Sequence, residues 1–98
     1  MVNKKKYHQN GKLESICTFI DGKENGEDKI YHYNGQICRT CSYINGKRNG
    51  EYLSYHEIGS LYGICTYNDG KRNGEYLEYN ENGKLIEQSI WKNGEKIE

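Results

Sequence analysis

The sequence predicts an all-β fold, an elongated antiparallel β-meander of about four stacked β-hairpin repeats. The main observation is a period of 24 residues that runs through most of the 98-residue chain without insertion or deletion. Composition supports strands, because the chain has ten tyrosines and lacks alanine, the best helix former. Twelve glycines and no proline leave frequent turns as the only interruptions of the strands.

Several rows of identical or similar residues carry the repeat. The rows are Gly11, Gly35, Gly59 and Gly83; Gly22, Gly46, Gly70 and Gly94; Tyr7, Tyr31, Tyr55 and Tyr79; Phe19, Tyr43, Tyr67 and Trp91; and Cys17, Cys41 and Cys65, with Ser89 in the fourth place. We therefore interpret residues 1–98 as a single repeat domain with units of approximately 4–26, 27–50, 51–74 and 75–98.

Each unit is expected to hold two antiparallel strands and two turns. Asn82-Gly83 is typical of a tight turn, because both residues tolerate positive φ. A longer turn is predicted over residues 69–74. One strand then ends near Tyr79, and the next runs from Leu85 to Trp91. Eight strands at ~4.8 Å spacing predict a sheet roughly 38 Å long.

Alternation along the strands predicts one regular, buried face. It carries Leu13, Ser15, Cys17 and Phe19 in the first unit and their equivalents in the others. Equivalent strands lie about 9.6 Å apart, whereas a disulfide needs Cα atoms within about 7 Å. The cysteine row is therefore expected to be a stack of small apolar side chains.

Other possible metal or redox residues are also weak candidates. Cys38 and Cys41 have the spacing of a metal or redox motif, but residues three apart on a strand point to opposite faces. Whether Cys38 is exposed and reactive stays open. His8, His32 and His56 are too far apart to converge and are expected to form a solvent-facing polar row. No cofactor or metal is expected.

Charge and hydropathy exclude several classes of function. Acidic and basic residues balance at 14 each, so no surplus positive charge favours nucleic acid. No apolar run is long enough to span a bilayer, and none follows the basic segment at residues 1–6 as in a secretory signal. The cysteines are then expected to be reduced thiols in a cytoplasmic protein.

Three segments resemble the MORN repeat in its variant form: residues 55–61, residues 67–75 and residues 79–85. The resemblance extends roughly from Tyr7 to Gly94. It implies a meandering stack of β-hairpins that serves in protein–protein contact, with membrane-lipid binding proposed for some members. Two loops depart from the pattern, because Tyr33 replaces the usual acidic residue and Ile58 replaces the turn asparagine. The type of the third tight turn therefore stays open.

We expect a non-enzymatic module that acts as a protein–protein interaction or scaffolding surface. Polar residues recur as rows, so that even Cys38 or Cys41 with His32 does not form a unique catalytic centre. The partner is expected to be another protein or a second copy, and no small-molecule substrate is expected. Aromatic side chains with a polar group suit such contacts, and Trp91 is the strongest single candidate. The candidate interaction surface is Tyr31, Tyr43, Tyr55, Tyr67, Tyr79 and Trp91.

The alternative function is peripheral binding to anionic membrane lipid. The loops over residues 46–50 and 70–74 are expected to present Lys47, Arg48, Lys71 and Arg72 together along one edge of the sheet. Glutamates at residues 27, 51 and 75 directly follow the loops over residues 22–26, 46–50 and 70–74 and oppose this positive charge.

Overall fold

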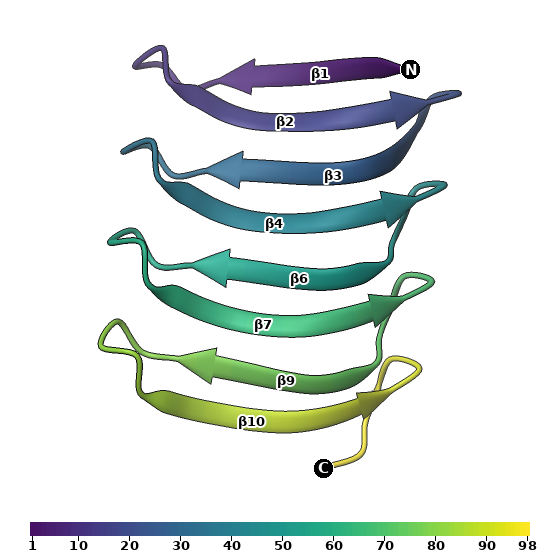
Figure 1. Cartoon of the computed structure of the whole chain (residues 1–98), viewed down its shortest axis with the longest axis vertical. Helices are drawn as coiled ribbons and strands as arrows, with labels where there is room; N and C mark the ends of the chain where they lie inside the picture. The colour runs from purple at the N-terminus through teal and green to yellow at the C-terminus, as the bar shows by residue number, and fades with distance from the viewer.

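The computed structural model describes all 98 residues as one 11-stranded antiparallel sheet (Figure 1). Three two-residue strands, β5 (Lys47–Arg48), β8 (Lys71–Arg72) and β11 (Glu95–Lys96), pair back onto β4, β7 and β10. The eight long strands follow one another in chain order: β1 (Val2–Tyr7), β2 (Leu13–Ile20), β3 (Lys23–Tyr31), β4 (Ile37–Ile44), β6 (Gly50–Tyr55), β7 (Leu61–Asn68), β9 (Gly74–Tyr79) and β10 (Leu85–Lys92).

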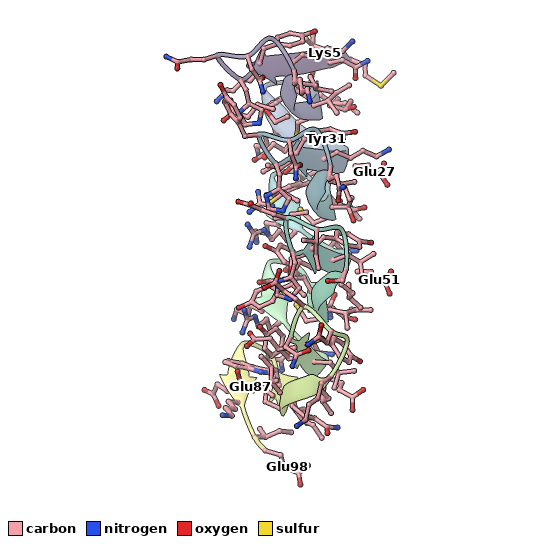
Figure 2. The ribbon with its side chains drawn as sticks, turned by 90° about the vertical axis from the view of Figure 1, so that its left-hand side faces the viewer. Lys5, Glu27, Tyr31, Glu51, Glu87 and Glu98 are labelled. Atoms are coloured by element: carbon pink, nitrogen blue, oxygen red, sulfur yellow. The ribbon has the colours of Figure 1, made fainter.

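The molecule is a single layer, as the edge-on view of Figure 2 shows. Its principal extents are 39 × 34 × 13 Å, and the longest agrees with the length expected from strand spacing. The predicted all-β meander of stacked hairpins is therefore confirmed. The chain contains no helix, and so none that could cross a membrane.

Two kinds of turn alternate along the chain, one at the right-hand ends of the strands in Figure 1 and the other at the left-hand ends. On one side, two-residue turns such as Asp69-Gly70 have φ of 51° and 87°, which suits the twist of a hairpin. On the other side, five-residue loops such as residues 56–60 close when the His56 N–H donates to the Ser60 carbonyl at 2.8 Å. The expected lengths were therefore wrong: Asn82-Gly83 lies in a longer loop, and Lys71–Arg72 forms β8.

The third long loop has the same backbone conformation as the others despite Ile58. The Gly59 N–H donates to the His56 carbonyl at 2.9 Å, just as Gly35 does to His32 in the preceding loop. Gly59 has a φ of 99°, so the residue needing positive φ is still a glycine. Ile58 itself is exposed and does not disturb the turn.

A β-bulge follows each long loop and reverses the expected side of one residue row. Ser54 pairs with Gly63, whereas Tyr55 pairs with Leu61, so Tyr62 has no partner of its own. Paired residues point to the same side of a sheet, and Tyr55 points opposite to Ser54. Leu61 therefore lies on the opposite side from Gly63. The expectation that the leucine row shares the cysteine face was wrong, and the same shift recurs for Leu13, Ile37 and Leu85.

We name the two sides by their residues. The front face carries Cys41, Cys65, Ser89, Tyr43, Tyr67 and Trp91, and the back face carries Leu53, Ile64 and Leu77. Five residues of the chain are buried, Asp28, Cys41, Gly63, Cys65 and Ser89, and the strand pairing places all of them on the front face. The cysteine row is therefore the most buried part of the sheet, with Cys41 and Cys65 only 3% and 4% exposed.

The seams between hairpins have shorter registered ladders than the hairpins themselves. Within the hairpin of β6 and β7, six residue pairs are in register. The seam that follows β4 has four, two with β5 and two with β6 (Arg39 with Ser54 and Thr40 with Leu53), and the seam between β2 and β3 has five. Further hydrogen bonds also connect successive repeats.

Histidines supply part of this bonding, which corrects the prediction of a solvent-facing row. His8, His32 and His56 are half-buried. Each Nε2 lies 2.8–3.0 Å from a tyrosine carbonyl 23 residues further along the chain, at Tyr31, Tyr55 and Tyr79. A carbonyl only accepts hydrogen bonds, so Nε2 is the donor. The histidines therefore fasten one repeat to the next.

Replacing His32 by alanine is expected to lower the free energy of unfolding by about 1 kcal/mol, because a half-buried carbonyl loses its donor. Urea denaturation followed by circular dichroism measures this change. The matched control is Glu57→Ala, which removes an exposed side chain in the neighbouring loop. Equal stability of His32→Ala and the wild type would contradict a structural role for the histidine.

Candidate interaction surface

Aromatic rings form two columns on the front face. Phe19, Tyr43, Tyr67 and Trp91 come from β2, β4, β7 and β10 at equivalent repeat positions. Tyr52 and Tyr76 form a shorter second column, because β6 and β9 pair them with Cys65 and Ser89. Sequence reasoning missed this second column. Its signal was the shared spacing of Tyr52 and Tyr76 after Gly50 and Gly74.

Two arginines each lie against two rings of one hairpin. The Arg48 guanidinium carbon is 5.2 Å from the Tyr52 ring centroid and 5.4 Å from that of Tyr67. The Arg72 carbon is 4.8 Å from Tyr76 and 5.1 Å from Trp91. These distances are in the range of cation–π attraction, so each arginine bridges two rings.

Hydrogen bonds fix the direction of the same arginines. Arg48 Nε donates to the Tyr43 hydroxyl and Arg72 Nε to the Tyr67 hydroxyl, both at 3.4 Å. The short strands β5 and β8 make this geometry possible, because they pair Arg48 with Tyr43 and Arg72 with Tyr67. We call the six residues Arg48, Tyr52, Tyr67, Arg72, Tyr76 and Trp91 the arginine–aromatic ladder.

This arrangement places the predicted row of basic loop residues on two different faces of the sheet. Arg48 and Arg72 are half-buried on the front face, whereas Lys47 and Lys71 alternate to the other side and are exposed. Lys47 Nζ also lies 3.7 Å from an Asp69 carboxylate oxygen. The expectation that all four cations project together from one edge was therefore wrong.

The predicted aromatic surface is divided in the same way. Tyr43, Tyr67 and Trp91 share the front face, but Tyr31, Tyr55 and Tyr79 end strands β3, β6 and β9 and point to the back. The backbone carbonyls of these last three accept the histidine hydrogen bonds. The structure therefore brings together three of the six residues on each face. The sequence did not reveal the bulge next to these tyrosines, and so it did not reveal the face to which they point.

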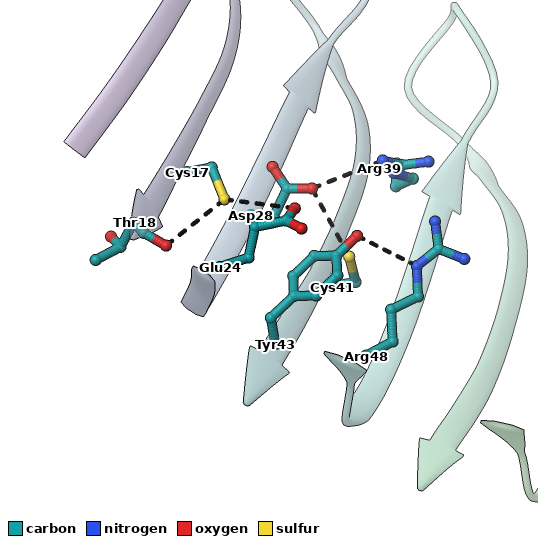
Figure 3. Close-up of polar contacts among 8 residues, drawn as sticks. All are labelled: Cys17, Thr18, Glu24, Asp28, Arg39, Cys41, Tyr43 and Arg48. Atoms are coloured by element: carbon teal, nitrogen blue, oxygen red, sulfur yellow. Dashed lines mark hydrogen bonds and ion pairs between the residues drawn. The ribbon is translucent and has the colours of Figure 1, made fainter. Parts of the chain in front are cut away.

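In the N-terminal half of the front face, two acidic residues replace an arginine and a tyrosine of the ladder (Figure 3). Glu24 occupies the repeat position of Arg48, and Asp28 that of Tyr52. The buried Asp28 carboxylate lies 3.6 Å from Arg39 and accepts a hydrogen bond from the Cys41 thiol at 3.9 Å. Glu24, Asp28 and Arg39 line an open hollow of about 380 Å³ that extends to Lys4 and Phe19.

Three of the four thiols are held in their neutral form. Burial, together with the nearby carboxylates of Asp28 and Glu24, raises the pKa of Cys17 to about 11. Burial also raises the pKa of Cys41 and of Cys65. A neutral thiol is a poor nucleophile and a poor metal ligand. No group of three or more His, Cys, Asp or Glu side chains is placed to hold a metal ion.

The repeat geometry agrees with a match to a known family. A model described as the MORN repeat variant matches residues 3–21, 24–45, 48–69 and 72–93. The chain belongs to the MORN repeat variant family. MORN repeats are generally associated with modules that bind proteins or membranes, and the family is a non-catalytic repeat family. Neither a curated protein nor a solved structure matches the chain.

The thiol pKa values make the MORN sheet sensitive to alkaline pH. The pKa of Cys17 rises on folding from 9.0 to about 11, so the unfolded chain loses this proton first. The stabilisation that the protonated Cys17 thiol contributes is therefore fully present below pH 9 and is lost as the pH rises through 11. We expect the free energy of unfolding to fall over this window, measured by urea denaturation, and to fall less in Cys17→Ser. A constant or rising free energy would contradict the assignment.

Proposed function

We propose that this MORN repeat protein is a non-enzymatic interaction module whose front face binds another protein. The observation that carries the proposal is the arginine–aromatic ladder on the open side of a one-layer sheet. Tyrosine, tryptophan and arginine are the residue types that contribute most at protein interfaces. The ladder presents all three on a sheet without a second layer of chain above it.

The charges of the ladder favour a partner with carboxylates. The ion pairs of the structure join Lys29 to Glu27, Arg39 to Asp28 and Lys47 to Asp69, so neither ladder arginine is neutralised. Guanidinium groups form paired hydrogen bonds with carboxylates while their planes stay stacked on aromatic rings. A protein segment that combines acidic and apolar side chains would satisfy both features of the ladder.

No catalytic role is part of the proposal. Residues suitable for catalysis recur as rows, and the raised thiol pKa values disfavour nucleophilic cysteine. We also propose a cytoplasmic location, which the four unpaired cysteines support.

Binding to anionic membrane lipid is the second candidate function. The exposed side chains of Lys47 and Lys71 support it, because they repeat along one edge of the sheet. The arginines of the predicted row support it less, because they are half-buried against rings on the front face.

The front-face proposal is tested by capture from cells of the protein's own host, with cross-linking and mass spectrometry. Trp91→Ala and Arg72→Glu are each expected to reduce the retained partner by about tenfold or more, because both residues belong to the ladder. Arg72→Lys keeps the charge but not the planar guanidinium, and an intermediate loss is expected. Circular dichroism verifies that each variant is folded.

Lys71→Glu is the matched control, because it reverses the charge of the adjacent residue on the other side of the strand. It should retain the partner at the wild-type level. A loss as large as that of Arg72→Glu would contradict binding through the front face. Sedimentation with phosphatidylserine vesicles tests lipid binding separately. If lipid is the ligand, the wild type should bind the vesicles, and binding should disappear when Lys47 and Lys71 are both changed to Glu.

A further inference from the structure

The two ends of the sheet expose different charges, lysines on β1 and Glu87 on the uncovered part of β10. At one end, β1 carries Lys4, Lys5 and Lys6, and all of its residues are exposed. At the other end, exposed Glu87 of β10 pairs directly with Glu78 of β9. Like charges in directly opposite positions destabilise a sheet. Figure 2 shows Lys5 and Glu87 at opposite ends of the ribbon.

The repeat defines how a further strand would add to β10. At the seam between β4 and β6, Arg39 pairs with Ser54. Glu87 is the equivalent of Arg39 two repeats later, and Lys6 is the equivalent of Ser54 two repeats earlier. A β1 strand laid on β10 in the register of this seam therefore places Lys6 directly opposite Glu87.

We propose that a second copy of this chain binds head to tail, with its β1 adding to the open edge of β10. The Lys6 ammonium of the incoming copy would then lie beside Glu87 and next to Glu78. Its charge would offset the repulsion between these two glutamates. By the same register, Lys5 would face Gln88, the equivalent of the Thr40–Leu53 pair in the seam. Backbone hydrogen bonds along the added strand would supply most of the contact.

The edge of β10 has room for this strand. A hollow of about 250 Å³ lies there, lined by Gln88, Ser89, Ile90 and Glu98. The C-terminal residues cover the edge only from Ile90 onward, where the Ile97 N–H donates to the Ile90 carbonyl at 2.8 Å. Residues 85–89 are left without a neighbour on this side.

The incoming strand would use residues 3–7. Val2 is the repeat equivalent of Glu98, so Met1 and Val2 of the incoming copy would have to turn away from the end of the first copy. Both are exposed, at 92% and 56%, and Val2 would give up its pairing with Phe19.

Charge selects this pairing over its alternatives. Two β1 edges would oppose lysines with lysines, and two β10 edges would bring Glu87 towards a second Glu87. Only the head-to-tail arrangement opposes lysine with glutamate. Such a contact uses different surfaces on the two copies, so it continues into an open assembly. Each copy would add eight strands, or about 38 Å of length at ~4.8 Å spacing.

Sedimentation velocity of the purified chain tests the proposal without any other protein. Association is expected to rise with protein concentration at about 0.02 M salt and to weaken at about 0.5 M salt, where exposed charges are screened. Lys6→Glu and Glu87→Lys should each weaken association by at least about fivefold, because each creates a like-charge contact. Both positions are exposed, and urea denaturation verifies unchanged folding.

A charge exchange separates a specific edge contact from general charge effects. Mixing Lys6→Glu protein with Glu87→Lys protein should restore association, because every contact between the two variants again opposes lysine with glutamate. Glu81→Lys makes the same charge change in an exposed loop of the last hairpin and should associate like the wild type. A monomer at all concentrations in low salt, or mixed variants that fail to associate, would overturn the proposal. Equal weakening by Glu81→Lys would also overturn it.

Discussion

The structure depends on hydrogen bonds that cross from each repeat to the next. A single layer of sheet has no second layer to bury its side chains, and only five residues of this chain are buried. The registered ladders at the seams are shorter than those within the hairpins, with four residue pairs where β7 meets β8 and β9. Histidine Nε2 atoms close the seams on one side of the sheet. Backbone bonds such as that from the Gly70 N–H to the Arg48 carbonyl, at 2.8 Å, close them on the other.

The same constraint links stability to the surface proposed for binding. Arg48 and Arg72 each contact two rings of one hairpin and donate a hydrogen bond to a tyrosine hydroxyl of the preceding hairpin, so these arginines join successive repeats. A partner on the front face would then find its contact residues already ordered, which lowers the entropic cost of binding. In the first two repeats Glu24 and Asp28 replace ladder residues, and an open hollow takes the place of stacked rings.

The repeat period was enough to predict the fold class, the strand positions and the buried cysteine row. These features follow from rows of residues at constant spacing, which the sequence displays directly. The bulge opposite Ser54 was not predictable in this way, because it adds one residue without changing the period. It transfers Leu61 and its equivalents to the back face. The predicted six-residue aromatic surface was therefore divided between two faces.

The roles of the histidines and arginines were hidden for a different reason. Both act between repeats, on partners that a reading of one strand at a time does not bring together. The Tyr55 carbonyl that binds His32 is 23 residues away, and the rings around Arg48 come from β6 and β7. A row of identical residues indicated that these positions matter in every repeat. It did not indicate that their partners lie in the next repeat.

Native-state hydrogen exchange measured by NMR tests the central claim most directly. If bonds between repeats hold the sheet together, the Gly46 and Gly70 amides at the seams should be protected as strongly as amides within the hairpins. Rapid exchange of these two amides while the hairpin amides stay protected would contradict the account. It would mean that each hairpin is stable without its neighbours.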